Sequence, residues 1–186
     1  MVQRAQINLT KILDVAIEIC NEKGYDEVSL SSISKRLGIK TPSLYNHIQG
    51  LHDLKQRMAY YGLQLLYDSI IHSVIGCIGE DAVISASKAY IEFANRNPGL
   101  YSSIAKVPDP HETQFNTLSN QLVQIYIKLF CFYNLSEEEN IHAIRGLRSM
   151  LHGFSSIKMD SGFRLNYSYE DSLNFAIRSF LRGLEK

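Results

Sequence analysis

Apolar residues recur at steps of three and four along most of this chain, which is the period of amphipathic helices. The clearest case is the carboxyl-terminal stretch, where one helical face would hold Leu173, Ala176, Ile177, Phe180, Leu181 and Leu184. The sequence has no strand-like alternation, no internal repeat and no low-complexity segment. The pattern therefore predicts an all-α chain of about nine helices.

Long helices are expected where this period is uninterrupted, over about 51–77, 81–97, 114–133, 137–159 and 169–184. Pro98-Gly99 ends the second of them, and the prolines of V-P-D-P-H-E forbid regular helix before the third. Ser136 followed by Glu139 is a capping-box signature that opens the fourth. The segment D-S-G-F-R-L-N-Y-S predicts a loop before the last helix.

Residues 29–48, S-L-S-S-I-S-K-R-L-G-I-K-T-P-S-L-Y-N-H-I, predict two short helices joined by a tight turn. The first helix has an apolar stripe made of Leu30, Ile33 and Leu37. Gly38 stands at the turn, which a residue without Cβ fills at little cost. We expect Thr41 to cap the second helix and Pro42 to take its first position, where a missing N–H costs nothing.

The second of these helices should turn Leu44 and Ile48 inward. Its outward side chains are expected to be Ser43, Tyr45, Asn46 and His47. The cations Lys35, Arg36 and Lys40 are expected beside them. Hydroxyl, amide, imidazole and cationic groups together suit the groove and backbone of duplex DNA. The alternative is an ordinary helix pair, with Tyr45 packed against a neighbour and Asn46 merely solvated.

Another apolar stripe lies upstream and is formed by Ile12, Leu13, Ala16, Ile17 and Cys20. It ends at Gly24, a residue type that often follows a helix. Three short helices with converging apolar faces predict a small DNA-binding head.

Residues 12–54 resemble the amino-terminal domain of the tetracycline-repressor (TetR) family. The matching positions are Gly24, Ser29-Leu30, Ile33, Leu37-Gly38-Ile39, Leu44-Tyr45-x-His47 and Leu54. The chain departs from the family pattern at Ile48, where Phe is usual. It also departs at Leu51, where a Lys usually contacts phosphate, which leaves that contact unassigned.

The resemblance implies a helix-turn-helix domain over residues 6–66, with the motif at 29–48, and a ligand-binding and dimerisation domain over 67–186. It implies a transcriptional regulator, by family habit a repressor released by a small molecule. Its partners would be a palindromic operator in double-stranded DNA and a second copy of itself. The residues expected at the DNA are Ser29, Lys35, Lys40, Thr41, Pro42, Ser43, Tyr45, Asn46 and His47.

The carboxyl-terminal half resembles family members that carry a Trp-His-Gly motif followed by Gly-Phe. Leu151 replaces the Trp, while His152-Gly153-Phe154 and Gly162-Phe163 match. In such relatives the last two long helices form a four-helix interface between subunits. The residues expected at a homodimer interface are Arg145, Arg148, His152, Leu173, Ile177, Phe180, Leu181 and Leu184, although the last helix could instead serve only its own core.

The second domain is expected to hold an effector of apolar or aromatic character. Candidate lining residues, each of which could equally be plain core, are Tyr61, Tyr90, Phe93, Tyr101, Phe115, Tyr126, Phe130, Met150 and Phe154. Effector binding would have to favour a spacing of the two heads that does not fit DNA.

Charge and cysteine usage agree with this interpretation. The net charge of the 186 residues is zero, but residues 1–60 carry eight Lys/Arg against six Asp/Glu. The three cysteines stand singly, so neither a disulfide framework nor a metal clip is expected. No signal peptide or membrane span is apparent, which predicts a soluble, cytoplasmic protein without a membrane partner.

The competing interpretations are a helical-bundle enzyme and a helical protein–protein adaptor. Glu139-x-x-His142 matches half of a di-iron motif, but the sequence has no second copy, no Gly-rich phosphate loop and no G-x-S-x-G. We therefore expect no enzyme activity, no metal and no cofactor. Salt-dependent affinity for duplex DNA would separate a regulator from both alternatives.

Overall fold

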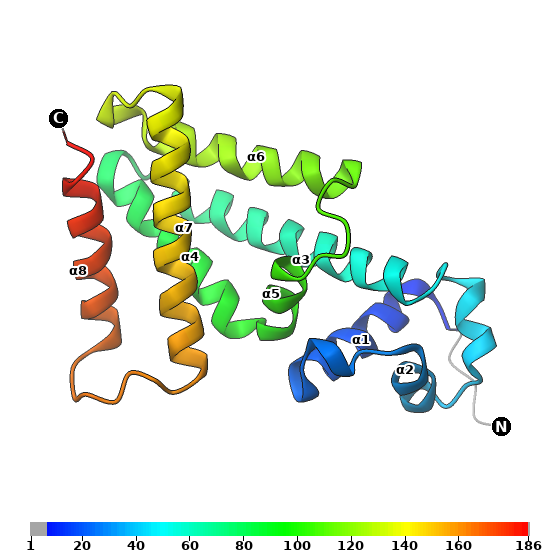
Figure 1. Cartoon of the computed structure of the whole chain (residues 1–186). Helices are drawn as coiled ribbons and strands as arrows, with labels where there is room; N and C mark the ends of the chain where they lie inside the picture. The colour runs from blue at the N-terminus through cyan, green and yellow to red at the C-terminus, as the bar shows by residue number, and fades with distance from the viewer. Residues whose placement is uncertain (1–6, 186) are drawn as a thin grey trace. The chain divides into compact units, whose positions relative to one another are not determined.

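The structure, a computed structural model, describes residues 7–185, and every regular element in that range is a helix (Figure 1). The described residues form eight α-helices and three 3-10 helices and contain no strand, which confirms the all-α prediction. The α-helices are α1 Leu9–Lys23, α2 Leu30–Leu37, α3 Leu51–Val74, α4 Gly79–Arg96, α5 Pro98–Ala105, α6 Thr113–Leu129, α7 Glu137–Met159 and α8 Tyr169–Arg182. The 3-10 helices are η1 Tyr25–Glu27, η2 Thr41–Asn46 and η3 Cys131–Tyr133.

The described residues divide into two compact units, residues 7–64 with 97–116 and residues 65–96 with 117–185. Helix α3 contributes to both, because its residues 51–64 belong to the first unit and 65–74 to the second. The domain limits expected from the sequence, 6–66 and 67–186, stay a prediction, and residues 6 and 186 lie outside the described range.

The first unit, here called the head, is built around one apolar cluster. Helices α1 and α2 pack together, η2 packs on α2, and α5 packs on α1 (Figure 1). The fully buried side chains of this cluster are Ile12, Ala16, Val28, Ile33, Leu44, Leu54 and Met58. They come from α1, the loop before α2, α2, η2 and α3, so one core holds these elements of the head in place.

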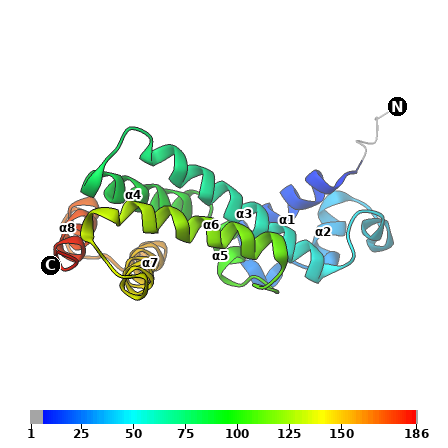
Figure 2. The ribbon, with the colours of Figure 1, turned by 90° about the horizontal axis from the view of Figure 1, so that it is seen from above.

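The second unit buries α4 against both α7 and α8, which also pack on each other (Figures 1 and 2). Helix α7 begins at the expected capping box, in which Ser136 Oγ accepts from the Glu139 amide at 3.2 Å and the Glu139 carboxylate accepts from the Ser136 amide at 2.7 Å. Leu173, Ile177 and Leu181 of α8 are buried within this unit. No helix in residues 7–185 has the length and apolar character needed to span a membrane.

Candidate functional site

The turn between α2 and η2 is held by local hydrogen bonds. Gly38 adopts a left-handed φ of 67°, as expected, and the Ile39 amide donates to Ser34 O at 3.0 Å. The hydroxyls of Ser34 and Thr41 are hydrogen-bonded across the turn at 3.0 Å. Because Ser34 is buried and needs a polar partner, this bond fixes the start of η2 against α2.

Three details of the expected second helix are wrong: its helix type, its cap, and the place of Pro42, which takes the second helical position rather than the first. The segment Thr41–Asn46 is a 3-10 helix rather than an α-helix, which suits a stretch of only six residues. Lys40, without any side-chain bond to the helix, takes the N-cap position. Thr41 cannot serve as the cap because it lies inside the helix and its hydroxyl bonds Ser34.

Side chains of η2 divide sharply between buried and exposed. Leu44 is fully buried and Ile48, just beyond η2, is buried as expected. Pro42, Ser43 and Asn46 are exposed and Tyr45 is 57 % exposed, while Thr41 and His47 are half-buried. The head thus presents a hydroxyl, a phenol and an amide on a backbone that is anchored by Leu44.

Two of the three cations predicted beside η2 are exposed without an ion pair among the described residues. Lys35 and Lys40 are exposed, and neither forms an ion pair within residues 7–185. Ser29, the remaining predicted contact, is the N-cap of α2, where its hydroxyl accepts from the Ser32 amide at 3.1 Å. The amino terminus of α2 can favour an anion, but the Ser29 hydroxyl is already engaged.

Arg36, by contrast, is tied to α1. Its guanidinium donates to both carboxylate oxygens of Glu22, at 2.9 and 2.5 Å, and lies 3.7 Å from Glu18. The hydrogen bond from Arg36 holds the pKa of the Glu22 carboxyl below its usual range. A guanidinium engaged in this way joins α2 to α1 and is not presented to DNA.

A carboxylate caps the start of α3. Asp53 Oδ2 accepts from the Gln49 amide at 2.9 Å, and Asp53 Oδ1 accepts from Arg57 Nε at 2.8 Å. A carboxylate therefore already occupies the positive end of the helix. Leu51 stands where the resemblance implies a Lys, so no phosphate contact is assigned to this position.

Within the head, residues 97–116 brace α1 and η1 through contacts that the sequence did not predict. The Gly99 amide donates to Asn21 Oδ1 at 2.8 Å, and Tyr25 Oη donates to Lys106 O at 3.0 Å. Desolvation in this contact raises the pKa of Tyr25. The pairings join residues about 80 positions apart in the sequence, so helical periodicity could not reveal them.

Gln56 and Asp109 add a second brace within the head. The Gln56 amide nitrogen donates to Asp109 O, and the Asp109 backbone amide donates to Gln56 Oε1, both at 3.0 Å. This reciprocal pair holds the loop that follows α5 against the first half of α3. The loop was expected from its prolines, but its partner was not.

The expected effector residues are divided between the two units. Tyr61, Tyr101 and Phe115 belong to the head, and the other members of the set belong to the second unit: Tyr90, Phe93, Tyr126, Phe130, Met150 and Phe154. In the second unit only Met150 and Phe154 of this set are half-exposed, and the rest are buried.

Tyr126 stands out within this set. Its hydroxyl is buried and has no hydrogen-bond partner among the described residues. Desolvation, followed by the nearby Tyr90, raises the pKa of Tyr126 well above its usual range.

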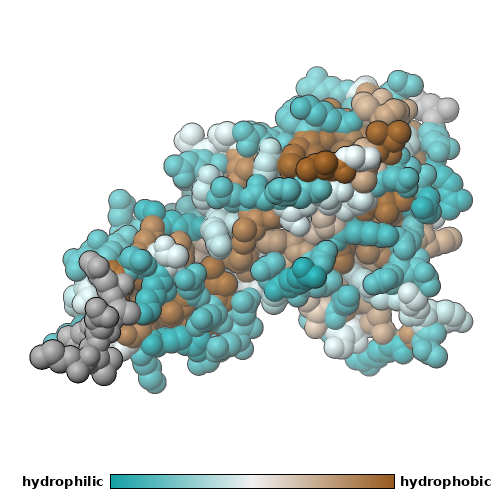
Figure 3. All heavy atoms as spheres, turned by 180° about the vertical axis from the view of Figure 1, so that it is seen from behind, coloured by the Kyte–Doolittle hydropathy of each residue, from teal (hydrophilic) through white to brown (hydrophobic). Residues whose placement is uncertain are grey.

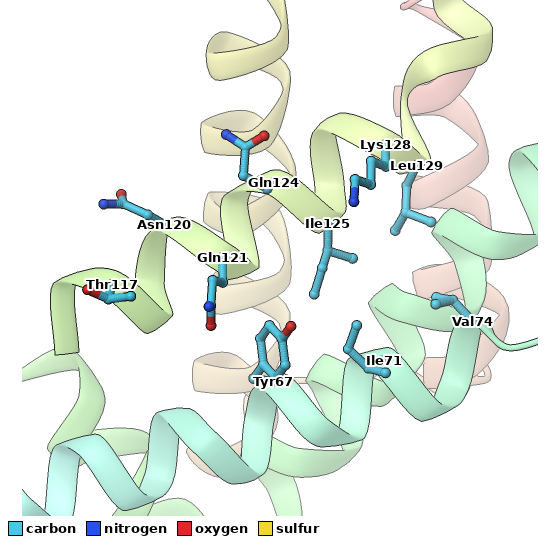
Figure 4. Close-up of a pocket in the computed structure, with 10 residues that line it drawn as sticks. All are labelled: Tyr67, Ile71, Val74, Thr117, Asn120, Gln121, Gln124, Ile125, Lys128 and Leu129. Atoms are coloured by element: carbon cyan, nitrogen blue, oxygen red, sulfur yellow. The ribbon is translucent and has the colours of Figure 1, made fainter. Parts of the chain in front are cut away.

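A groove of about 600 Å³ lies between α3 and α6 in the second unit (Figure 4). It is lined by Tyr67, Ile71, Val74, Thr117, Asn120, Gln121, Gln124, Ile125, Lys128 and Leu129, none of which was expected at a ligand site from the sequence. Periodicity can assign them to helices, but it cannot tell which two helices stand apart. Within residues 7–185, no group of three or more His, Cys, Asp or Glu side chains could hold a metal.

The expected dimer residues fall into two sets. Arg145, Arg148 and His152 are exposed on α7, and Phe180 and Leu184 are half-buried. Leu173, Ile177 and Leu181 are buried against their own chain. Phe175, which was not expected from the sequence, is 70 % exposed on α8, and apolar surface is visible on this unit from behind (Figure 3).

Two family profiles match the chain. Residues 12–49 match that of the tetR family of bacterial regulatory proteins, and residues 83–180 match the tetracyclin repressor-like C-terminal domain. An uncharacterized HTH-type transcriptional regulator of Bacillus subtilis (strain 168), YobS, is 39 % identical over 183 residues, which are 96 % of this chain and 94 % of that protein. The tetracycline repressor protein class D of Escherichia coli is 33 % identical over 128 residues, covering 63 % of this chain and 53 % of the repressor.

Solved structures share the same fold at lower identity. A protein of unknown function from Rhodococcus sp. RHA1 superimposes with a TM-score of 0.83 at 14 % identity, over 100 % of both chains. The TetR family transcriptional regulator PfmR of Thermus thermophilus gives a TM-score of 0.71 at 17 % identity, over 98 % of this chain and 100 % of that one.

Proposed function

We propose that this chain, which belongs to the TetR family of transcriptional regulators, acts as a homodimeric repressor that leaves a palindromic operator when an apolar or aromatic small molecule binds it. Family membership favours a DNA-binding regulator over the bundle enzyme and the adaptor. A regulator of chromosomal operators works where the chromosome is, so we place it in the cytoplasm.

The observation that carries this proposal is the presentation of η2. Leu44 is fully buried while Ser43, Tyr45 and Asn46 around it are exposed. Polar side chains on an anchored backbone can reach base edges, and Lys35 and Lys40 can neutralise phosphates beside them. Thr41, Pro42, His47 and the α2 amino terminus at Ser29 complete the proposed DNA surface.

The proposed dimer uses the solvent face of α7 and α8. Arg145, Arg148 and His152 share one side of α7, and Phe175 stands exposed on α8. An exposed aromatic side chain of this size suits burial between subunits. Two copies of η2 related by a two-fold axis would read half-sites about one helical turn of DNA apart, or a multiple of it.

The effector is proposed to bind the second unit. A bound molecule can change DNA affinity only by favouring one spacing of the two heads over another. Helix α3 can couple ligand binding to the head because it is continuous through both units. Its Leu54 and Met58 lie in the head core, and its Tyr67 and Ile71 line the groove.

The test is a double substitution, Tyr45→Ala with Asn46→Ala, in the full-length chain. Operator affinity, measured on duplex DNA from upstream of its own gene, should fall by at least about a hundredfold, because each base contact contributes roughly 1–3 kcal/mol. Helix content and the sedimentation of the dimer should not change. The matched control is Tyr167→Ala, which removes another highly exposed tyrosine.

Unchanged affinity in the double variant would contradict the proposed reading surface. Equal losses in the double variant and in Tyr167→Ala would assign the effect to general loss of surface aromatics. A wild-type chain that binds unrelated duplex DNA as tightly as its upstream region would count against an operator-specific role.

A further inference from the structure

The groove between α3 and α6 has an apolar floor. Ile71 and Val74 come from α3 and Ile125 and Leu129 from α6, and all four are half-buried. Figure 4 shows Ile125 and Leu129 pointing from α6 toward α3, with Tyr67 and Ile71 facing them. Apolar side chains left partly in water on two facing helices are stabilised when another apolar surface covers them.

The rim of the groove is polar but almost uncharged. Thr117, Asn120, Gln121 and Gln124 follow one side of α6 and offer hydroxyl and amide groups. Lys128 is the only ionic side chain among the lining residues, and none of them is acidic. In Figure 4 its ammonium group extends down beside Ile125 into the space between the helices.

The dimensions suit one small organic molecule. The volume of about 600 Å³ lies within the range of small-molecule sites. Thr117 and Lys128 are separated by eleven helical steps, or roughly 16 Å along α6. The occupant should therefore be longer than it is wide, with its charge toward the Lys128 end.

We propose that this groove binds an elongated organic monoanion, whose apolar body covers Ile71, Val74, Ile125 and Leu129 and whose acidic group pairs with Lys128. The rim amides of α6 then accept or donate hydrogen bonds along the ligand. The inference rests on the proposed function, because it assigns a chemical class and a place to the effector. A second copy of the chain is a less suitable occupant, because the lone cation has no acidic residue on the opposite wall to pair with in a symmetric contact.

The experiment compares two fluorescent probes on the full-length protein. Anilinonaphthalene sulfonate carries an aromatic body and a sulfonate, and phenylnaphthylamine carries the same body without the anion. Lys128→Gln should weaken binding of the sulfonate by about threefold to fivefold, which is the effect of one solvent-exposed ion pair. Binding of phenylnaphthylamine should change by less than about twofold, and Lys128→Arg should retain sulfonate affinity.

Two further variants locate the effect. Ile125→Gln replaces part of the half-buried floor and should weaken both probes together, with its melting temperature confirming the fold. Lys88→Gln removes an exposed lysine of α4 outside the groove, and both probes should bind it as they bind the wild type. If Lys88→Gln and Lys128→Gln weaken the sulfonate equally, the charge effect is general and the assigned site is wrong.

The outcomes separate this inference from the repressor function. Unchanged binding of both probes to Ile125→Gln would overturn the groove as their site, whatever the protein does on DNA. A change in oligomeric state of Ile125→Gln, with probe affinity intact, would show that a second copy covers the groove and would also overturn the inference. Failure of the wild type to bind the duplex DNA from upstream of its own gene would instead refute the proposed function, and the probe result would remain valid.

Discussion

The head and the second unit expose functional surface in different ways. In the head, six consecutive residues, Thr41–Asn46, supply both the buried anchor Leu44 and the exposed groups around it. In the second unit, the groove is formed by residues 67–74 and 117–129, which are far apart in the sequence. The proposed DNA-reading surface is therefore specified by a short continuous stretch, whereas the proposed effector surface depends on how distant helices stand apart.

This difference matters for interpreting relatives of the chain. A stretch such as 29–48 keeps its side-chain directions as long as the turn at Gly38 and the anchor Leu44 are kept. A groove between α3 and α6 can change its chemistry through a single surface residue such as Lys128, with little effect on the fold. DNA reading and effector choice are thus expected to be separable by substitution.

The largest expected effect is on the head core. Leu44→Ala removes a fully buried side chain and should lower the free energy of unfolding by about 2–5 kcal/mol. Urea denaturation followed by circular dichroism measures this loss, and operator affinity should fall with it because η2 loses its anchor. The control is Leu165→Ala in the loop between α7 and α8, a residue 80 % exposed, which should stay within about 0.5 kcal/mol of the wild type. Equal stability of the two variants would refute the role given to Leu44.

Local chemistry made much of the head predictable. The tight turn at Gly38 and the inward Leu44 and Ile48 all depend on residues within a few positions of each other. The cap expected at Thr41 was wrong because its hydroxyl bonds Ser34, a local side-chain alternative to capping that the sequence pattern does not distinguish.

Distant contacts were out of reach of the sequence. The bond between Gly99 and Asn21 spans 78 positions, and the reciprocal pair of Gln56 and Asp109 spans 53. Asn21 and Gln56 do not reveal these partners in the sequence, because asparagine and glutamine also occur as solvated surface residues.

The lining of a groove likewise comes from distant segments. The aromatic residues expected around an effector therefore fall in two units, and the groove with an aliphatic floor was not predicted.

The next effect tests the brace on the head. A Cβ added at Gly99 would lie 2.5 Å from Asn21 Oδ1 and 3.0 Å from Cys20 Cβ, so Gly99→Ala should lower the unfolding free energy by about 1–3 kcal/mol. Gly153→Ala in α7 is the matched substitution in the second unit, where nothing lies within 4 Å of the new methyl. It should stabilise the chain by about 0.5–1 kcal/mol, because glycine in a helix costs more backbone entropy than alanine. Thermal melting of both variants measures the contrast, and a stabilised Gly99→Ala would show that the brace tolerates separation from α1.

The smallest expected effect distinguishes two neighbouring cations of the head. Lys40→Ala should reduce the dependence of log affinity on log salt by about 0.9 for each phosphate contact removed, or about twice that in a dimer. Arg36→Ala should leave this slope unchanged, because the guanidinium is held by Glu22 and Glu18 and does not face the operator.

The Arg36→Ala substitution should instead let the pKa of the Glu22 carboxyl rise toward its ordinary value, since the hydrogen bond that lowers this pKa is lost. In the wild type this pair favours the folded state above the ordinary glutamate pKa, about 4.3, and that contribution disappears as the pH falls through the lowered value. Operator titrations at several salt concentrations and an NMR titration of Glu22 make the two measurements. If the salt dependence of operator affinity falls equally in Lys40→Ala and Arg36→Ala, Arg36 contacts the DNA, and its ion pair with Glu22 must break when phosphate binds.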